Sequence, residues 1–262
     1  MTVQIVLDYV NSLAPKQMKY DWDNVGLLCG RRDQEVNKIL VALDPFMDVC
    51  EEARAVGADL IVTHHPLIFR APRTVTTDDT VGQCILFLAA NGISAVNAHT
   101  NLDCAPDGVN DVLARTLGLE DVQVLNPMGT DAEGRPWGLL RVGNVEQMPL
   151  EDFLNRVKDR LHTPVLRYAD GGKSVCRVAV GGGACGDAYP EALAAGCDTL
   201  VTADVKYNQF WDAHDLGLNL IDAGHFYTEN PVCTVLAEKL QAQFPEIEVV
   251  LSKNHADCMK FF

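Results

Sequence analysis

Histidine and carboxylate side chains follow three short apolar segments of the chain. The segments are LIVT, SAVNA and LIDAG, and the residues after them include His64 with His65, His99 with Asp103, and His225 with Glu229. Imidazole nitrogens and carboxylate oxygens bind divalent metals such as Zn, Fe, Mn, Co and Ni. One histidine in such a place is more often an ordinary hydrogen-bonded residue. Several of them at corresponding places predict a metal site.

The spacing of these residues indicates how the ligands would be shared. His64 and His65 are neighbours, so on an extended strand their rings would point to opposite faces. At a strand end they could instead address two adjacent ions, which the two oxygens of Asp103 could bridge. His225 and Glu229 are four residues apart and would meet on one face of a helix. We expect two divalent ions, each with roughly two to three protein ligands and positions open for water.

The segments that carry these residues have the pattern of alternating strands and helices. From Lys38, KILVALDP predicts a strand, EEARAVGAD a helix, DLIVTHHPLIF a strand, VGQCILFLAANG a helix and ISAVNAHTNLD another strand. A further helix is predicted from Val109 to about Leu117. Strand, helix, strand favours parallel pairing, and the carboxyl ends of parallel strands are where loops converge on ligands.

The second half repeats this order with VCRVAVGGG, PEALAAG, DTLVTADVKYN and LNLIDAGHFYTE. EARAVGADLIVT from Glu52 and EALAAGCDTLVT from Glu191 share seven of twelve residues, although αβ units in general look somewhat alike. We expect an α/β fold of two related lobes, residues 1–126 and 127–262, each with a mixed, mostly parallel sheet flanked by helices. The metal site would lie in the cleft between them, and the C-terminal segment could pack back on the first lobe.

Two further segments have recognisable local patterns. MGTDAEGRPWGLLRVG, between the halves, predicts turns and a hairpin, and LEDFLNRVKDRL predicts an amphipathic helix.

Composition narrows the class of protein. The formal net charge is −15, which disfavours a non-specific nucleic-acid binder because such proteins need Lys and Arg to neutralise phosphates. No apolar run reaches the roughly 20 residues that span a membrane. The opening TVQIVLDYVNSLAP is too polar for a secretory signal, and the nine Cys residues include no CxxC pair. We expect a cytoplasmic protein with reduced thiols.

Five segments resemble the Nif-three-like family, whose members are also described as GTP cyclohydrolase I type 2-like dinuclear metal-binding proteins. They are WDNVGLLCG, THHPLIF, NAHTNLD, TADVKYNQF and DAGHFYTE, and they run in order over nearly the whole chain. The resemblance implies a dinuclear centre whose ligands are His64, His65, Asp103, His225 and Glu229, with His99 close by. It also implies a ring-shaped homohexamer with the sites facing an internal cavity. Ala203 stands where the family usually has Gly, a departure that leaves these ligands unchanged.

Hydrolysis is the simplest chemistry for such a centre, because paired cations make a bound water acidic and hold the leaving oxygen. His99 or Glu229 would move a proton, or His99 would only orient Asp103. The resemblance suggests GTP as substrate, attacked at C8 of guanine. The phosphate donors would be Lys206, Arg70, Arg73 or the backbone from Gly181, although Gly181–Gly183 is more typical of a tight turn after a buried strand.

Two non-catalytic functions use the same ligands. The protein could store or deliver metal, or it could be a regulatory scaffold whose metals are structural. Asp44 and Asp204 stand at strand ends and would line the cavity or cap helices. Trp22–Gly26 would form a lid over the site or pack before a strand.

Overall fold

The computed structural model describes all 262 residues and divides the chain into two compact units. The first unit contains Met1–Leu102 and Cys233–Asp257, and the second contains Asp103–Val232 and Cys258–Phe262. The boundary between the units falls inside α4 (Thr100–Cys104) and again inside α10 (Pro231–Gln243).

The first boundary of this partition lies before the expected division after residue 126, whereas the return of the C-terminal segment to the first unit agrees with the expectation that it could pack back there. β5 (Glu120–Leu125) pairs with β8 (Leu140–Met148) and so belongs to the second unit. β13 (Glu248–Leu251), near the end of the chain, pairs with β2 (Lys38–Ala42) of the first unit.

The first unit is built on a five-stranded sheet with the order β1-β4-β3-β2-β13. The other strands are β1 (Gly26–Cys29), β3 (Leu60–Thr63) and β4 (Ser94–Asn97). All ladders are parallel except the one between β1 and β4. Every residue of β3 and β4 is buried, as expected of central parallel strands covered on both faces.

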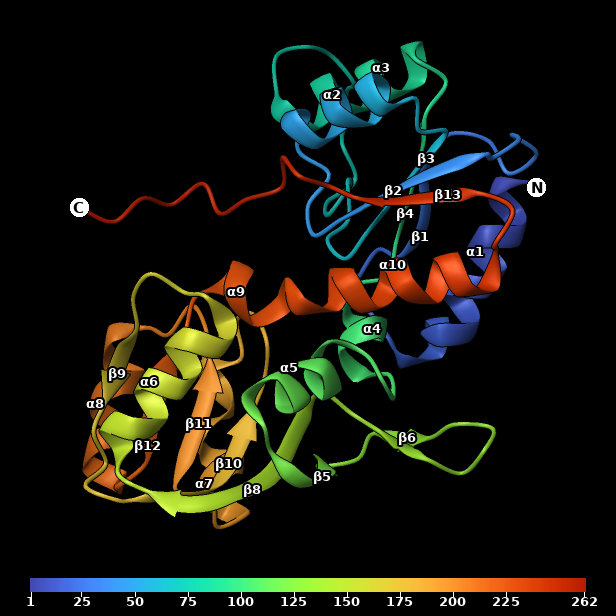
Figure 1. Ribbon diagram of the computed structural model, residues 1–262. Helices are drawn as coiled ribbons and strands as arrows, with labels where there is room; N and C mark the ends of the chain where they lie inside the picture. Colours follow the sequence, from blue (N-terminus) through green and yellow to red (C-terminus); the bar gives the residue numbers. More distant parts are fainter. The chain divides into compact units, whose positions relative to one another are not determined.

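Helices cover this sheet on both sides (Figure 1). α2 (Met47–Val56) and α3 (Thr80–Ala90) pack on Leu40, Ile61 and Ala95. On the other side lie α1 (Val3–Leu13) and α10. The ring of Tyr9, on α1, is 5.4 Å from the ring of Phe244, which directly follows α10. A short 3-10 turn, η1 (Lys16–Met18), follows α1.

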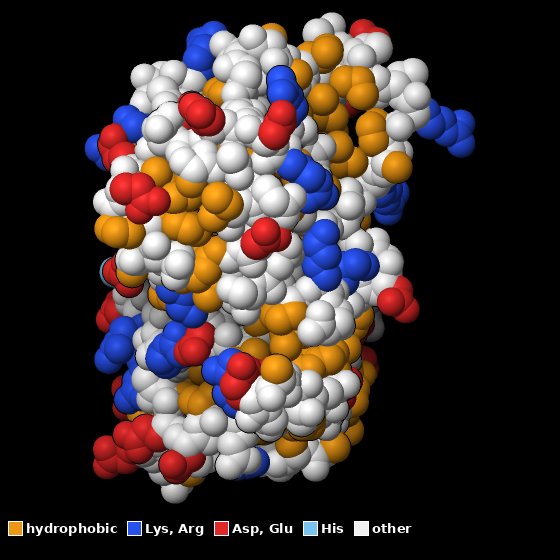
Figure 2. All heavy atoms as spheres, turned by 90° about the vertical axis from the view of Figure 1, so that its right-hand side faces the viewer, with side chains coloured by type: hydrophobic (Ala, Val, Ile, Leu, Met, Phe, Trp, Pro, Cys, Tyr) orange, Lys and Arg blue, Asp and Glu red, His pale blue; other side chains and the backbone are white.

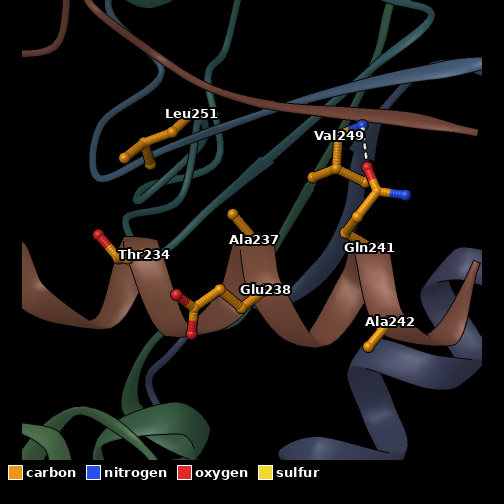
Figure 3. A pocket seen from close by; sticks show the side chains of 7 residues that line it. All are labelled: Thr234, Ala237, Glu238, Gln241, Ala242, Val249 and Leu251. Carbon is orange, nitrogen blue, oxygen red and sulfur yellow. Dashed lines mark hydrogen bonds between the residues drawn. The ribbon is translucent and has the colours of Figure 1, made fainter. Parts of the chain in front are cut away.

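The outer edge of the first sheet is protected. The side chain of Gln241, on α10, accepts a hydrogen bond from the backbone N–H of Val249, on the edge strand β13. A hollow of about 460 Å³ lies between this helix and the strand (Figure 3). Its wall is formed by Thr234, Ala237, Glu238, Gln241, Ala242, Val249 and Leu251. A covered N–H makes the edge a poorer template for another strand.

The second unit has a six-stranded sheet with the order β5-β8-β10-β11-β12-β9. Its remaining strands are β10 (Val175–Val180), β11 (Thr199–Thr202), β12 (Asn219–Asp222) and β9 (Arg167–Ala169). The central ladders, β10 to β11 and β11 to β12, are parallel, and the outer three are antiparallel. The expected hairpin forms from β6 (Gly129–Thr130) and β7 (Pro136–Trp137).

The helices of the second unit also cover both faces of its sheet. α5 (Val109–Leu117) and α6 (Leu150–Leu161) pack on the face that carries Val178 and Val180. α7 (Tyr189–Ala194) and α8 (Tyr207–Leu216) pack on the face that carries Ala179. Successive side chains of β10 therefore point to opposite faces, as in any strand, and both faces are buried. A 3-10 turn, η2 (Gly186–Ala188), precedes α7, and α9 (His225–Glu229) follows β12.

The predicted α/β class with two helix-flanked mixed sheets is therefore confirmed. The helices expected at Val109–Leu117 and over LEDFLNRVKDRL occur as α5 and α6. The parallel order β2-β3-β4 in one unit has its counterpart in β10-β11-β12 in the other. An internal duplication remains a prediction that this shared order supports.

Candidate metal-binding residues

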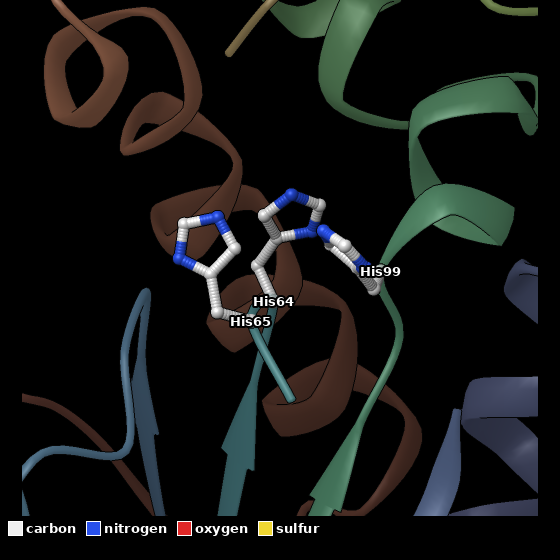
Figure 4. Close-up of side chains that lie close together, drawn as sticks. All are labelled: His64, His65 and His99. Atoms are coloured by element: carbon white, nitrogen blue, oxygen red, sulfur yellow. The ribbon is translucent and has the colours of Figure 1, made fainter. Parts of the chain in front are cut away.

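Three histidine rings gather in the first unit, at the carboxyl ends of two neighbouring parallel strands. His64 and His65 follow β3 directly, and His99 follows β4 after one further residue. Each ring offers a nitrogen, and the three nitrogens lie within 4.8 Å of one another. Figure 4 shows the rings side by side. The predicted convergence of strand ends on one point therefore occurs for these three residues.

Each ring of this cluster is held through its Nδ1 atom. Nδ1 of His65 lies 2.6 Å from Oδ1 of Asp44, Nδ1 of His99 lies 2.8 Å from Oδ1 of Asp23, and Nδ1 of His64 lies 3.0 Å from the carbonyl oxygen of Ala98. All three partners are acceptors, so each Nδ1 donates. A neutral imidazole that donates through Nδ1 presents a lone pair at Nε2. This is the arrangement by which metal-binding histidines are oriented.

Asp23 is a buried carboxylate that organises the segment around His99. It accepts from the His99 ring, from the Thr100 backbone N–H at 3.0 Å and from the Thr100 hydroxyl at 2.5 Å. Burial would raise the pKa of Asp23, but the hydrogen bonds from His99 and Thr100 lower it to about 2. The carboxylate is therefore ionised near neutral pH and can stabilise positive charge on the His99 ring.

In the second unit, His225 and Glu229 lie one helical turn apart on α9. The His225 Nε2 atom is 3.1 Å from Oε2 of Glu229, and its Nδ1 atom donates to Oδ2 of Asp204 at 2.7 Å. With the Nδ1 proton directed to Asp204, Nε2 and the Glu229 carboxylate meet as two acceptors. A cation between them, either a ring proton or a metal ion, makes the contact favourable. Asp204 has the left-handed φ of 51°, a strained conformation typical of functional sites.

The glycine turn after β10 makes room for this pair. A Cβ atom on Gly183 would lie 2.2 Å from Oε1 of Glu229 and 3.1 Å from Nε2 of His225. Gly183 also has a φ of +64°, which disfavours a side chain. Its N–H donates to the Thr228 hydroxyl at 3.0 Å. The turn is therefore packed against the carboxylate and the imidazole.

Asp103 begins the second unit, four residues after His99, and polar contacts hold its backbone. Its carbonyl oxygen accepts from Asn110, whose amide oxygen accepts in turn from the Gly182 N–H at 2.7 Å. The next two carbonyls, of Cys104 and Ala105, accept from the buried guanidinium of Arg141. Arg141 is 37 residues from Cys104 and 36 from Ala105, so no local sequence pattern indicates these contacts.

The Asp103 carboxylate lies in the same electrostatic environment as Glu229. Burial raises the pKa of the Cys185 thiol, and the negative charges of Asp103 and Glu229 raise it further. Asp103 is 6% exposed and Glu229 is 4% exposed. The second unit thus holds two buried carboxylates near one thiol, and buried carboxylates are usually paired with cations or hydrogen-bond donors.

The sequence anticipated the clustered residues better than the groups that orient them. Asp44 and Asp204 were expected to line a cavity or to cap helices, and the structure gives them a third role as partners of His65 and His225. Asp23 was not singled out at all. Its only signal is its place within the WDN segment, because its partner His99 lies 76 residues away.

The glycine turn and Lys206, two of the proposed phosphate donors, have other roles in the structure. The Gly181 N–H donates to the Val201 carbonyl and the Gly182 N–H to Asn110. With the Gly183 N–H also paired, the Gly181–Gly183 turn has no N–H directed to a ligand, which favours the tight-turn interpretation. Lys206 pairs with Asp187 at 3.2 Å and caps α8. Arg70 and Arg73 are exposed.

Comparison with known proteins identifies the family of this chain. The model of the Duf34/NIF3 (NGG1p interacting factor 3) family matches residues 1–257. The chain belongs to the Duf34/NIF3 family. This confirms the resemblance found in the sequence. Among curated relatives, a "GTP cyclohydrolase 1 type 2 homolog" of Clostridium perfringens is 35% identical over 264 residues. The alignment covers 100% of this chain and 100% of the relative. A relative of the same name from a Nostoc species is 38% identical over 87% of this chain and 86% of its own.

Solved NIF3-type structures have the same fold. A Bacillus cereus protein related to NIF3 superposes with a TM-score of 0.94 at 26% identity, covering 100% of this chain and 99% of the other. A Staphylococcus aureus hypothetical protein gives 0.93 at 30% identity with the same coverage.

Three further features of this NIF3-family chain concern its cysteines, its surface charges and its helices. All nine cysteines are free thiols. Lys and Arg side chains are interspersed with Asp and Glu on the face drawn in Figure 2. None of the helices combines the length and apolar character that crossing a bilayer requires.

Proposed function

We propose that His64, His65, Asp103, His225 and Glu229 bind two divalent metal ions and that the protein is a metal-dependent hydrolase of a nucleotide or another phosphorylated small molecule. The metal ions would be Zn, Fe, Mn, Co or Ni, because mixed nitrogen and oxygen ligands suit all five. The proposal extends the narrower finding that His and Glu side chains form groups able to hold a metal ion.

The orientation of the imidazoles carries this proposal. His65, His99 and His225 each direct Nδ1 to an aspartate, and His64 directs Nδ1 to a carbonyl oxygen. Four rings that all donate through the same nitrogen present four Nε2 lone pairs. Exposed His214 also donates through Nδ1, to the carbonyl oxygen of Asp170, so the tautomer supports metal binding only together with the clustering of the His64, His65 and His99 rings.

Bound divalent cations would supply Lewis acidity, which lowers the pKa of water and stabilises a leaving oxygen. The residues of the chain would move the proton. His99 can accept a proton at Nε2, because its Nδ1 proton is directed to the ionised Asp23. Asp23 would then stabilise the imidazolium, as the buried aspartate of a histidine-based catalytic pair does. Glu229 is the second candidate for proton transfer.

A nucleotide is the substrate class that the relatives support best. Curated relatives carry the name GTP cyclohydrolase 1 type 2 homolog, and that name describes chemistry at a guanine ring. The assignment to this chain therefore rests on family membership together with the ligand set.

The deciding experiment combines metal content with turnover. Chelator-treated protein would be reloaded with each of the five metals, and its metal content would be measured by elemental mass spectrometry. Each sample would then be incubated with GTP, GMP and simpler phosphate esters. We expect about two ions per chain and product formation with at least one metal. His64→Ala and Asp103→Ala should lose both, whereas the matched control His214→Ala, on the exposed face of α8, should keep both.

Two outcomes would replace this proposal by another function. Stable metal binding without turnover of any substrate, combined with transfer of the metal to an acceptor protein, would indicate metal delivery or storage. Unfolding or dissociation on metal removal would indicate a structural role. The cytoplasmic location and the ring-shaped homohexamer remain predictions, and light scattering of the purified protein measures the second.

A further inference from the structure

Two exposed aromatic side chains lie beside His99 in the histidine cluster of the first unit. Trp22 is 60% exposed and Phe69 is 50% exposed. Their ring centroids are 5.7 Å apart, and each lies 6.2 Å from the ring of His99. Tyr20 lies parallel to Trp22, with 5.9 Å between centroids and an angle of 8° between the planes. We refer to Tyr20, Trp22 and Phe69 as the aromatic platform.

Hydrogen bonds fix the backbone under this platform. Asp23, next to Trp22, is buried and is bonded to His99 and Thr100. The Asn24 amide donates to the carbonyl of Ile68, next to Phe69, at 2.6 Å. The platform is thus joined from both sides to the segments that carry the histidines. Buried Asp23 and half-buried Asn24 hold it in place.

Folding does not require these two rings to face solvent. Exposed indole and phenyl surface costs free energy in water, and rigid exposed aromatic groups beside a polar cluster are typical of ligand sites. A planar ring is the shape that two neighbouring aromatic side chains recognise best, through stacking on one ring and edge contact with the other. Aliphatic and sugar ligands gain less from such a surface.

We propose that Trp22 and Phe69 bind the planar heteroaromatic ring of the substrate, of the size of a nucleobase, and so position the molecule beside His99. This inference rests on the proposed function, because it assigns the ring-binding part of the same site. Arg70 follows Phe69 directly and is exposed, so an anionic group on the same ligand would find positive charge next to the platform. Trp22 and Phe69 are positioning residues in this scheme, and recognition occurs without metal.

Binding to metal-free, full-length protein tests the platform separately from catalysis. Equilibrium dialysis would compare GMP with ribose 5-phosphate, which has the same phosphate and sugar but no nucleobase. Stacking on one aromatic side chain is worth roughly five- to a hundredfold in affinity. Trp22→Ala should weaken GMP binding by that factor and leave ribose 5-phosphate unchanged. Trp22→Tyr, which keeps an aromatic ring, should restore most of the affinity.

Trp211→Ala is the matched control, because Trp211 is 54% exposed and belongs to α8 in the second unit. It should leave both affinities unchanged. Metal content and melting temperature of Trp22→Ala should match those of the wild type, since the side chain is exposed. A Trp137→Phe, Trp211→Phe double variant leaves Trp22 as the sole tryptophan, and GMP should quench its fluorescence.

The platform is refuted if GMP and ribose 5-phosphate bind equally, or if Trp22→Ala leaves GMP binding unchanged. It is also refuted if a second copy of the chain already shields Trp22 from a soluble quencher. Failure of the proposed function looks different. In that case GMP binding still depends on Trp22, but no metal and no phosphate ester supports turnover.

Discussion

Replacing Gly183 by alanine should uncouple metal binding from folding. The added Cβ atom would lie 2.2 Å from Oε1 of Glu229, whereas ordinary contacts begin at 3.4 Å. The carboxylate oxygen would therefore have to move by about 1.2 Å to regain an ordinary contact distance. The new atom would also lie 3.1 Å from Nε2 of His225. A displacement of about 1 Å in a preorganised site can cost on the order of a hundredfold in function.

The backbone cost of this substitution can be measured on its own. Gly196 has a φ of +74°, close to the +64° of Gly183, but a Cβ atom there would meet nothing within 4 Å. Both alanine variants should lose about 1 kcal/mol of unfolding free energy from left-handed strain. Only Gly183→Ala should also lose metal affinity, by roughly tenfold to a hundredfold.

Two measurements on each variant suffice. Urea unfolding of metal-free protein gives the stability change, and competition with a chromophoric chelator gives the metal affinity. Equal metal affinity of the two variants would contradict this expectation, because the carboxylate would then tolerate displacement. So would a loss of metal affinity in Gly196→Ala as large as that in Gly183→Ala, since strain alone would account for the effect.

Three further changes have defined outcomes. Asp44→Asn removes the charge that orients His65 and should weaken metal binding by roughly tenfold or more at unchanged melting temperature, as the same chelator competition would show. Burial lowers the pKa of His255 below its ordinary 6.5, so the folded state prefers the neutral ring, and stability should fall as pH drops below 6.5. Urea unfolding at pH 7.5 and 5.5 should show a smaller fall for His255→Gln. Arg141→Met should cost about 3–5 kcal/mol in the same assay because a buried ion pair is broken, whereas Arg115→Met, in an exposed pair, should cost under about 1 kcal/mol.

Local sequence patterns predicted the regular elements well. α5 and α6 occur at the residues expected, because apolar side chains at helical spacing fix both length and buried face. The strands that end before His64, His99 and His225 were also expected. Such short apolar runs become buried strands wherever helices flank them on both sides.

Pairing between distant segments could not be predicted in the same way. β13 joins β2 across some 200 residues, and neither strand carries a local signal for its partner. The same holds for Asp23 and His99, which lie 76 residues apart. A carboxylate that orients an imidazole is recognised only when folding brings the two together. The candidate ligands could therefore be selected from their places at strand ends, but the groups that orient their rings could not.

The origin of β13 also bears on how the protein is made. All strands of the second unit lie between Glu120 and Asp222, so its sheet can form while later residues are still being synthesised. The first unit must wait for its fifth strand. Until the turn after that strand appears, buried Glu52 lacks the Ser252 hydroxyl and the Lys253 and Asn254 N–H groups that bond it. The first unit of the nascent chain would thus be the last to complete its sheet. A chaperone that binds nascent chains would protect the open edge of β2 until then.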